Sequence, residues 1–267
     1  MIIRKVDIWH LNLPFLSPIK HNLATHTSSA NLVVKVTADT PRPGYGEGVP
    51  REFVTGETLS GSLAFLLETL IPTLWDLEFS SPPQLREALN DLFRQTDGER
   101  HPAAFCALET ALLDAAGRAW DLPLYEFFGP HRGGVLIYSA VIPMASREQM
   151  ARLLGLVKTM AMPFLKLKVG GADDLEVLKL ARETLGWKVD IRVDANCAWT
   201  ATEAIRRLRE LAPYRLSAVE QPVAKEDFEG LKEVGAATGL PVIADESLCT
   251  EAEARRLIDL KACGLFN

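Results

Sequence analysis

The feature that most constrains the fold is a strict alternation of strand-like and helix-like segments from about residue 135 onward. Each of four consecutive strand-like segments ends in a charged side chain. These residues recur almost evenly: 26 residues separate Lys168 from Asp194, 26 separate Asp194 from Glu220, and 25 separate Glu220 from Asp245. Such alternation predicts a parallel sheet covered by helices, either a doubly wound sheet or a β/α barrel.

The spacing of the charged residues favours the barrel. One strand-helix unit takes about this length in a barrel of ~250 residues and eight units, and the carboxyl ends of its strands form one rim. A doubly wound sheet would instead spread the charges along an edge. We therefore expect an α/β protein whose N-terminal part is a separate α+β domain (residues 1–133, a three-stranded sheet plus helices). Residues 134–267 would form the first five to six units of an incomplete (β/α) TIM-like barrel.

The N-terminal part shows a different pattern. Two strand-like runs in the first 40 residues flank a polar segment, SPIKHNLATHTSSA at 17–30, which we expect to be a loop. PRPGYGEGVP at 41–50 is typical of a turn-rich loop, whose glycines we interpret as turn residues rather than a nucleotide-binding loop. From Thr58 to about Leu122 the pattern predicts helices, one of them beginning at Ser81-Pro82.

The segment FLKLKV at 164–169 places two lysines on one face of a strand. Residues two apart point to the same side, so Lys166 and Lys168 face one way while Leu165, Leu167 and Val169 face the other. A solvated edge strand would also show this pattern. In a buried strand the two ammonium groups require charged partners.

Three carboxylates at one rim would repel one another, and a hard divalent cation would relieve that repulsion. Carboxylate oxygens suit Mg²⁺, so Asp194, Glu220 and either Asp245 or Glu246 form a candidate metal site. We expect the neighbouring lysine and the metal to lower the pKa of Lys166 and Lys168, giving a usable base. The alternative for each carboxylate is N-capping of the helix that follows it.

Four short motifs resemble those of the enolase superfamily, in its mandelate racemase/muconate lactonizing enzyme subgroup. They are LKLK at 165–168, VDAN at 193–196, VEQP at 219–222 and ADES at 244–247. Residues 107–129 resemble the family signature before the barrel, and residues 44–58 resemble the part of the capping domain that closes on substrate. The resemblance covers essentially the whole chain.

The resemblance implies a role for each matching residue. Asp194, Glu220 and Asp245 would hold one Mg²⁺ per subunit, with Lys168 as general base and Lys166 as its electrostatic support. Asn196 and Glu246 would lie behind these groups, and Lys20, His21, His26 and Arg51 would contact substrate from two loops. The family also carries a lysine on the opposite face of the substrate, at about position 271.

That position lies beyond Asn267, the last residue of the sequence. A closed barrel that begins near Val135 would run to roughly position 340. We therefore expect a C-terminally truncated chain: either a fragment of a longer enzyme, or a protein that is not a working enzyme by itself.

The expected reaction is Mg²⁺-dependent removal of an α-proton from a small carboxylate substrate, giving a metal-stabilised enolate. VTGET at 54–58 and the lysine pair most resemble dipeptide epimerases of the L-Ala-D/L-Glu type. N-acylamino acid racemase, o-succinylbenzoate synthase and muconate cycloisomerase activities stay open. A truncated, non-catalytic metal-binding domain is the alternative from another class.

Composition limits the partners and the compartment. The net charge of −6 argues against nucleic acid or an anionic membrane as the main partner. Four cysteines without a CxxC pair fit a reduced, cytoplasmic compartment. No stretch reaches the roughly 18 apolar residues of a membrane span. Proteins of this class often assemble, so we expect a homo-oligomer.

Overall fold

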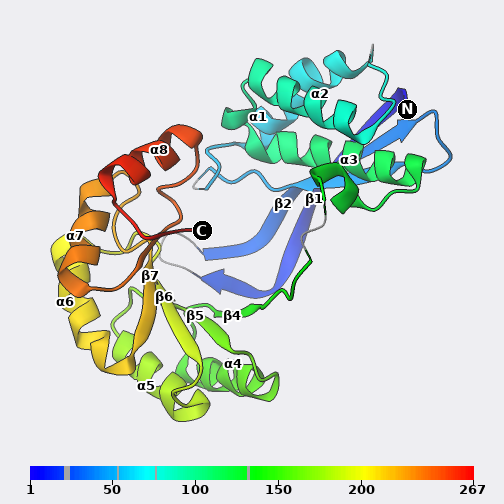
Figure 1. The fold of residues 1–267 in the computed structure, drawn as a ribbon. Helices are drawn as coiled ribbons and strands as arrows, with labels where there is room; N and C mark the ends of the chain where they lie inside the picture. The colour runs from blue at the N-terminus through cyan, green and yellow to red at the C-terminus, as the bar shows by residue number, and fades with distance from the viewer. Residues whose placement is uncertain (21–24, 53, 76, 131–132) are drawn as a thin grey trace. The chain divides into compact units, whose positions relative to one another are not determined.

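The computed structural model describes residues 1–20, 25–52, 54–75, 77–130 and 133–267. The chain divides into two compact units (Figure 1). The first comprises residues 1–17 and 27–134, and the second comprises residues 135–267 with the described part of 18–26.

The first unit packs a three-stranded sheet, of order β1-β2-β3, against helices. Leu32, Val34 and Val36 alternate along β2 and are fully buried, as the period of a strand requires. A π-helical segment and a 3-10 turn continue α1, and two further 3-10 turns flank α3. The elements are β1 (Ile3–Lys20), β2 (Thr25–Ala38), β3 (Gly44–Gly48), α1 (Leu59–Ala64), Phe65–Leu70, Ile71–Leu74, α2 (Pro82–Gln95), Gly98–Arg100, α3 (Pro102–Trp120) and Leu124–Phe128.

Two expectations for this region were wrong. The polar segment 17–30 is mostly strand, because β1 continues to Lys20 and β2 begins at Thr25. Backbone pairing between strands does not depend on apolar side chains, so polarity alone misled the prediction. The glycine-rich segment 44–48 is also a strand, β3, which pairs antiparallel with β2.

The glycines of β3 are required by its contact with α3. A Cβ atom added at Gly44, Gly46 or Gly48 would lie 2.0–2.2 Å from backbone atoms of α3. The facing side of the helix carries alanines, including Ala107 and Ala111, so strand and helix backbones approach closely. The glycines therefore serve packing rather than a turn.

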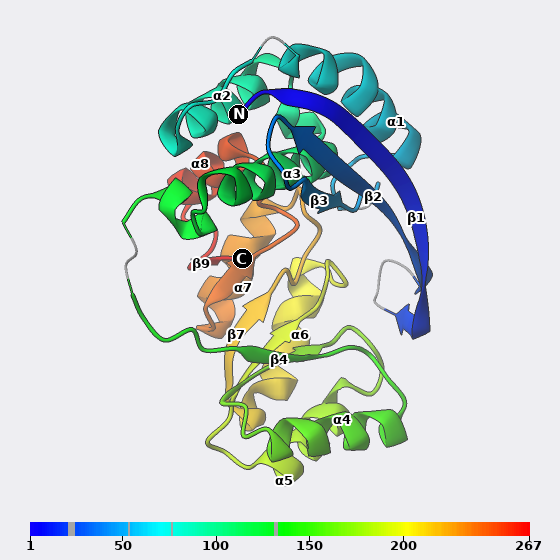
Figure 2. The same cartoon turned by 90° about the vertical axis from the view of Figure 1, so that its right-hand side faces the viewer.

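The second unit alternates strands and helices as predicted. Figures 1 and 2 show α4 to α8 along the outer side of a sheet whose strand order, β4-β5-β6-β7-β8-β9, follows the chain. The described pairs are parallel. The elements are β4 (Ser139–Ile142), α4 (Arg147–Thr159), β5 (Phe164–Lys168), α5 (Asp174–Leu185), β6 (Asp190–Asp194), α6 (Ala201–Leu211), a 3-10 turn (Ala212–Tyr214), β7 (Leu216–Glu220), α7 (Phe228–Thr238), β8 (Val242–Ala244), α8 (Glu251–Leu260) and β9 (Leu265–Phe266).

The fold class is confirmed: an α+β part precedes an incomplete β/α barrel. The predicted capping box of Ser146 and Gln149 opens α4, and α2 begins at Pro82 after Ser81. The strand expected from Val135 begins only at Ser139, because its parallel partner β5 pairs with residues 139–142. Among the described helices, none is both long and apolar enough to cross a membrane.

The core of the second unit lies between the sheet and the helices. Leu165, Leu167 and Val169 are fully buried in it, together with Ile191 and Val193 of the neighbouring strand. Alternate residues of β5 and β6 therefore point to the opposite face of the sheet.

Arg182 of α5 forms hydrogen bonds with backbone groups near the amino-terminal ends of the strands of this sheet. Its side chain is 5% exposed and donates hydrogen bonds to four backbone carbonyls. The oxygens of Tyr214, Arg215 and Val189 lie 2.7–2.8 Å from the guanidinium nitrogens, and that of Gly186 lies at 3.3 Å.

We expect Arg182→Met to lower the free energy of unfolding by about 3 kcal/mol, because the lost charged donor leaves buried carbonyls unpaired. Urea titration followed by circular dichroism measures this change. Arg206→Met is the matched control. Arg206 is exposed and, among the described residues, pairs with Glu210 in the next turn, so its loss should cost less than about 1 kcal/mol. Equal effects of the two substitutions would contradict the assignment.

Candidate metal and proton-transfer site

The site is built at the carboxyl ends of four neighbouring parallel strands. In the sheet register Lys168 of β5 lies beside Asp194 of β6, and Asp194 lies beside Glu220 of β7. Glu220 pairs in turn with Ile243 of β8, two residues before Asp245. Because the strands are parallel, charged residues that are evenly spaced in the sequence lie side by side at one edge of the sheet.

The carboxylates of Asp194, Glu220 and Asp245 converge there. Each offers an oxygen, and these oxygens all lie within 4.8 Å of one another. Asp194 and Glu220 are fully buried, and Asp245 is half-buried. The N-capping alternative does not hold, because other residues cap the helices that follow: Thr200, Asp227 and Thr250 accept hydrogen bonds from the first turns of α6, α7 and α8.

Both lysines of β5 point into this carboxylate group. The Lys166 Nζ lies 2.6 Å from Glu220 Oε1 and 3.0 Å from Asp194 Oδ2, and the Lys168 Nζ lies 2.5 Å from Asp194 Oδ2. Their side chains are only 12% and 19% exposed. Since β5 lies between β4 and β6, the solvated-edge alternative is wrong.

Asn196 and Glu246 extend the same network. Asn196 Oδ1 accepts a hydrogen bond of 2.7 Å from Lys168 Nζ, and its Nδ2 donates to Glu246 Oε1 at 2.9 Å. The Asn196 backbone N–H donates to Asp194 Oδ1 at 3.0 Å. Asn196 thus fixes the orientation of a lysine and of two carboxylates.

The crowding of charges shifts the pKa values of the site. Burial, reinforced by the charges of Asp194 and Asp245, raises the pKa of Glu220 to about 7 against the hydrogen bond from Lys166. Burial would also raise the pKa of Asp194, but its contacts with Lys168 and Lys166 outweigh that effect and the pKa is lowered.

The protein groups around Lys166 act against the expected lowering of its pKa. Burial of its ammonium group favours a lower pKa, but the hydrogen bond to Glu220 and the charges of Asp194 and Glu220 raise it overall. The expectation weighed one neighbouring lysine and a metal, whereas two carboxylates lie in direct contact with this side chain.

The arrangement fits a divalent cation. The donors are carboxylate oxygens, the ligand type that Mg²⁺ prefers. Among the described residues, the buried Glu220 Oε2 has no hydrogen-bond partner, and the nearby Arg192 Nε lies 3.6 Å away. A cation would satisfy this oxygen and favour the ionised form of Glu220, whose pKa burial raises.

Several residues of the site escaped the sequence reasoning. Arg192 stands two positions before Asp194 on β6, so strand periodicity could have identified it. Asn267 donates from Nδ2 to Glu220 Oε1 at 3.2 Å. Gln221 and Ser247, both fully buried, lie in loops just after the strands, where no periodicity indicates the direction of a side chain.

Three of the four residues expected to contact substrate lie within the described part of the chain. Lys20 is the last residue of β1, and the half-buried His26 lies near the start of β2. His21 is outside the described residues. Arg51 belongs to the first unit, where it is exposed in a turn whose backbone bonds to Val54 and Thr55.

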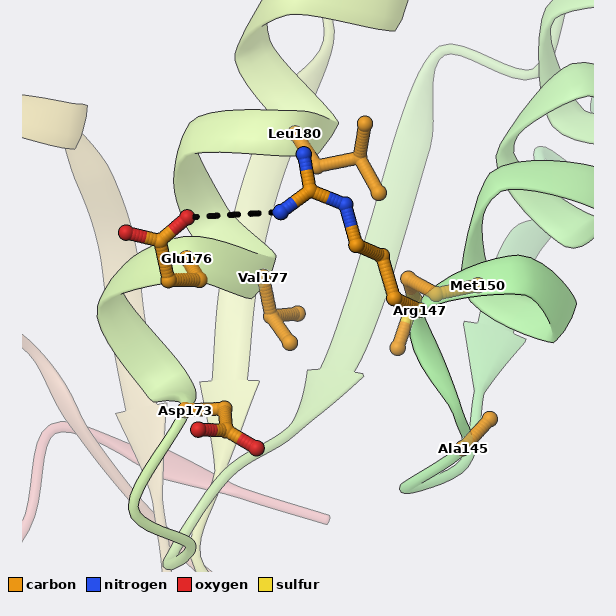
Figure 3. A pocket seen from close by; sticks show the side chains of 7 residues that line it. All are labelled: Ala145, Arg147, Met150, Asp173, Glu176, Val177 and Leu180. Carbon is orange, nitrogen blue, oxygen red and sulfur yellow. Dashed lines mark ion pairs between the residues drawn. The ribbon is translucent and has the colours of Figure 1, made fainter.

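A separate hollow of about 250 Å³ lies between α4 and α5 (Figure 3). Arg147 and Glu176 form an ion pair of 3.8 Å across it, and both side chains are largely exposed. Asp173 lies apart from that pair in the picture. Apolar residues complete the lining: Ala145, Met150, Val177 and Leu180. This hollow lies in the helical layer, and its lining contains none of the three carboxylates that converge at the strand ends.

Comparison with known proteins agrees with the fold. Residues 148–267 match the family model described as "Enolase C-terminal domain-like". The chain is 31% identical over 274 residues to the L-Ala-D/L-Glu epimerase of Clostridium acetobutylicum, covering 100% of this chain and 74% of that protein.

Solved structures show the same similarity. The dipeptide epimerase from Enterococcus faecalis, complexed with Mg and the dipeptide L-Leu-L-Tyr, matches with a TM-score of 0.86 and 29% identity over 100% of this chain and 74% of its own. The N-succinyl Arg/Lys racemase from Bacillus cereus matches with a TM-score of 0.88 and 28% identity over 100% and 72%. With its strand-end carboxylates, its lysine pair and these relatives, the chain belongs to the enolase superfamily.

Proposed function

We propose that the protein is a Mg²⁺-dependent epimerase that removes the α-hydrogen of a dipeptide as a proton. One observation carries the proposal: three carboxylates converge within 4.8 Å of one another, and two lysine Nζ atoms lie 2.5–3.0 Å from the same group. The similarity to dipeptide epimerases supports the substrate class. Within it, we propose an L-Ala-D/L-Glu type of substrate.

Asp194, Glu220 and Asp245 would hold one Mg²⁺ per subunit. When bound, the ion would supply positive charge that stabilises the negative charge developing on the substrate carboxylate. Asn196 holds Asp194 and Glu246 in place through its backbone and side-chain donors.

Lys168 would take the proton from the α-carbon. It lies at the end of β5, whereas Lys166 lies two residues deeper, bonded to Glu220 and Asp194. The Asn196 carbonyl and the Asp194 carboxylate orient the Lys168 Nζ, which would accept the α-proton as the neutral amine. Lys166 would keep a positive charge beside the carboxylates. Since both lysines stand on one strand, return of a proton to the opposite face needs a third group.

The domain roles and the substrate contacts complete the proposal. Residues 1–133 would cap the site and residues 134–267 would carry the chemistry. Lys20, His26 and Arg51 would select the substrate side chain. The described part of 18–26 groups with the second unit, which supports a role near the chemistry for Lys20 and His26.

The test is exchange of the dipeptide α-hydrogen for deuterium in D₂O, followed by proton NMR. We expect exchange with Mg²⁺, loss of at least about 10³-fold after chelation, and recovery when Mg²⁺ is restored. A dipeptide amide, which lacks the free carboxylate, is the matched control and should not exchange. Exchange that persists after complete metal removal overturns the metal's role. Metal binding without exchange of any dipeptide instead favours the non-catalytic alternative.

A further inference from the structure

We infer that Gln221 is a positioning residue that holds the backbone of residues 245–247, and with it the carboxylates of Asp245 and Glu246, toward the metal centre. The inference rests on the metal site proposed above. It concerns a residue that contacts none of the reacting groups itself and that acts through the loop following β8.

The side-chain oxygen of Gln221 binds this loop directly. Gln221 Oε1 accepts hydrogen bonds from the backbone N–H groups of Asp245 at 3.0 Å and Ser247 at 3.1 Å. One fully buried oxygen therefore fixes the peptide groups on either side of the Asp245–Glu246 pair. Two such bonds restrict the direction in which the side chains of Asp245 and Glu246 leave the backbone.

The side-chain nitrogen of Gln221 closes the link to a second loop. Nε2 donates to Val223 O at 3.0 Å and to Ser247 Oγ at 2.7 Å. Ser247 Oγ donates in turn to Lys225 O at 2.7 Å. Ser247 is fully buried, so the loops after β7 and β8 are joined by a satisfied buried network, which rigidifies such structures.

The backbone of Gln221 connects the same region to a third strand end. Its N–H donates to Ile243 O at 3.0 Å, and its carbonyl accepts from Cys197 N at 2.9 Å. Its φ of +35° is unusual for a residue other than glycine. Gln221 directly follows Glu220, a proposed metal ligand. Its unusual backbone conformation therefore lies between Glu220 and the loop that carries Asp245, the next proposed ligand.

The experiment measures the Mn²⁺ affinity of Gln221→Met by electron paramagnetic resonance. Methionine has a similar volume but cannot make these bonds, so Asp245 loses its fixed position. Loss of outer partners of ligands weakens metal binding about 10–100-fold, and we expect a Kd at least about tenfold higher. Circular dichroism establishes that each variant is folded at the temperature of the titration.

Arg182→Met is the matched control. Arg182 is also buried and its side chain also makes four hydrogen bonds, all of them to backbone carbonyls at the opposite end of the sheet. It should lose stability while keeping the Mn²⁺ Kd of the wild type, which separates positioning from general destabilisation. A similar weakening of Mn²⁺ binding in both variants overturns the inference.

If Gln221→Met does not fold, the Mn²⁺ affinity of Ser247→Ala tests the inference instead. This substitution removes the 2.7 Å hydrogen bond between Gln221 Nε2 and Ser247 Oγ but keeps the hydrogen bond from Asp245 N to Gln221 Oε1. A smaller loss of Mn²⁺ affinity, of about threefold or more, therefore supports the inference. An unchanged Kd in the folded variant overturns it while the proposed function stands. Wild-type protein that binds no Mn²⁺ overturns the metal site and the inference together.

Discussion

Lys168→Ala is expected to reduce α-hydrogen exchange from one stereoisomer of the dipeptide by about 10³-fold. A positioned general base contributes 10²–10⁴-fold, and Lys168 is the lysine nearer the carboxyl end of β5. Alanine removes both the base and its contacts with Asp194 and Asn196. The measurement is deuterium incorporation in D₂O from each stereoisomer, by NMR, with Mg²⁺ present.

Lys179→Ala provides the matched control, because Lys179 is an exposed lysine of α5 and its loss should leave exchange unchanged. Mn²⁺ binding by Lys168→Ala shows that the carboxylate site is still formed. Exchange from both stereoisomers within about tenfold of the wild type would remove Lys168 from the role of base.

Gly46→Ala is expected to lower the free energy of unfolding of the first unit by at least about 3 kcal/mol. The added Cβ would lie 2.1 Å from Ala107 O, 2.3 Å from Thr110 Oγ1 and 2.5 Å from Ala111 N. Backbone atoms of α3 cannot yield as a flexible side chain does, so strand and helix must separate. Overpacking of a tight contact costs 1–3 kcal/mol and sometimes more.

Urea denaturation followed by circular dichroism measures this loss, with Gly134→Ala as control. Gly134 has no described atom within 4 Å of the position of an added Cβ, so that substitution should change stability by less than about 0.5 kcal/mol. A loss below about 1 kcal/mol for Gly46→Ala would show that β3 and α3 can move apart at little cost.

Much of the second unit follows from local patterns. Parity along FLKLKV assigned Lys166 and Lys168 to the face opposite Leu165 and Leu167, and the core has that arrangement. The even spacing of charged strand ends predicted that Asp194, Glu220 and Asp245 would converge, because parallel strands carry an equal interval into adjacent positions. Their roles in binding metal and moving protons stay predictions.

Other features depend on contacts that sequence patterns do not encode. The direction of Gln221 follows from its left-handed backbone and from partners in the next loop. The raised pKa of Lys166 depends on its distances from Asp194 and Glu220. The glycines of β3 resemble turn residues until the Ala-rich face of α3 is placed against them.

The alternation along β5 has an evolutionary consequence. Odd-numbered side chains from Leu165 to Val169 belong to the core, while Lys166 and Lys168 contact the carboxylates. Substitutions at the even positions therefore change the charges of the site while the apolar packing of this strand against the helices is kept. An insertion or deletion of one residue would exchange the two sets, burying ammonium groups among leucines. New reactions can therefore evolve here through substitutions in this strand, whereas a change in its length would disrupt the fold.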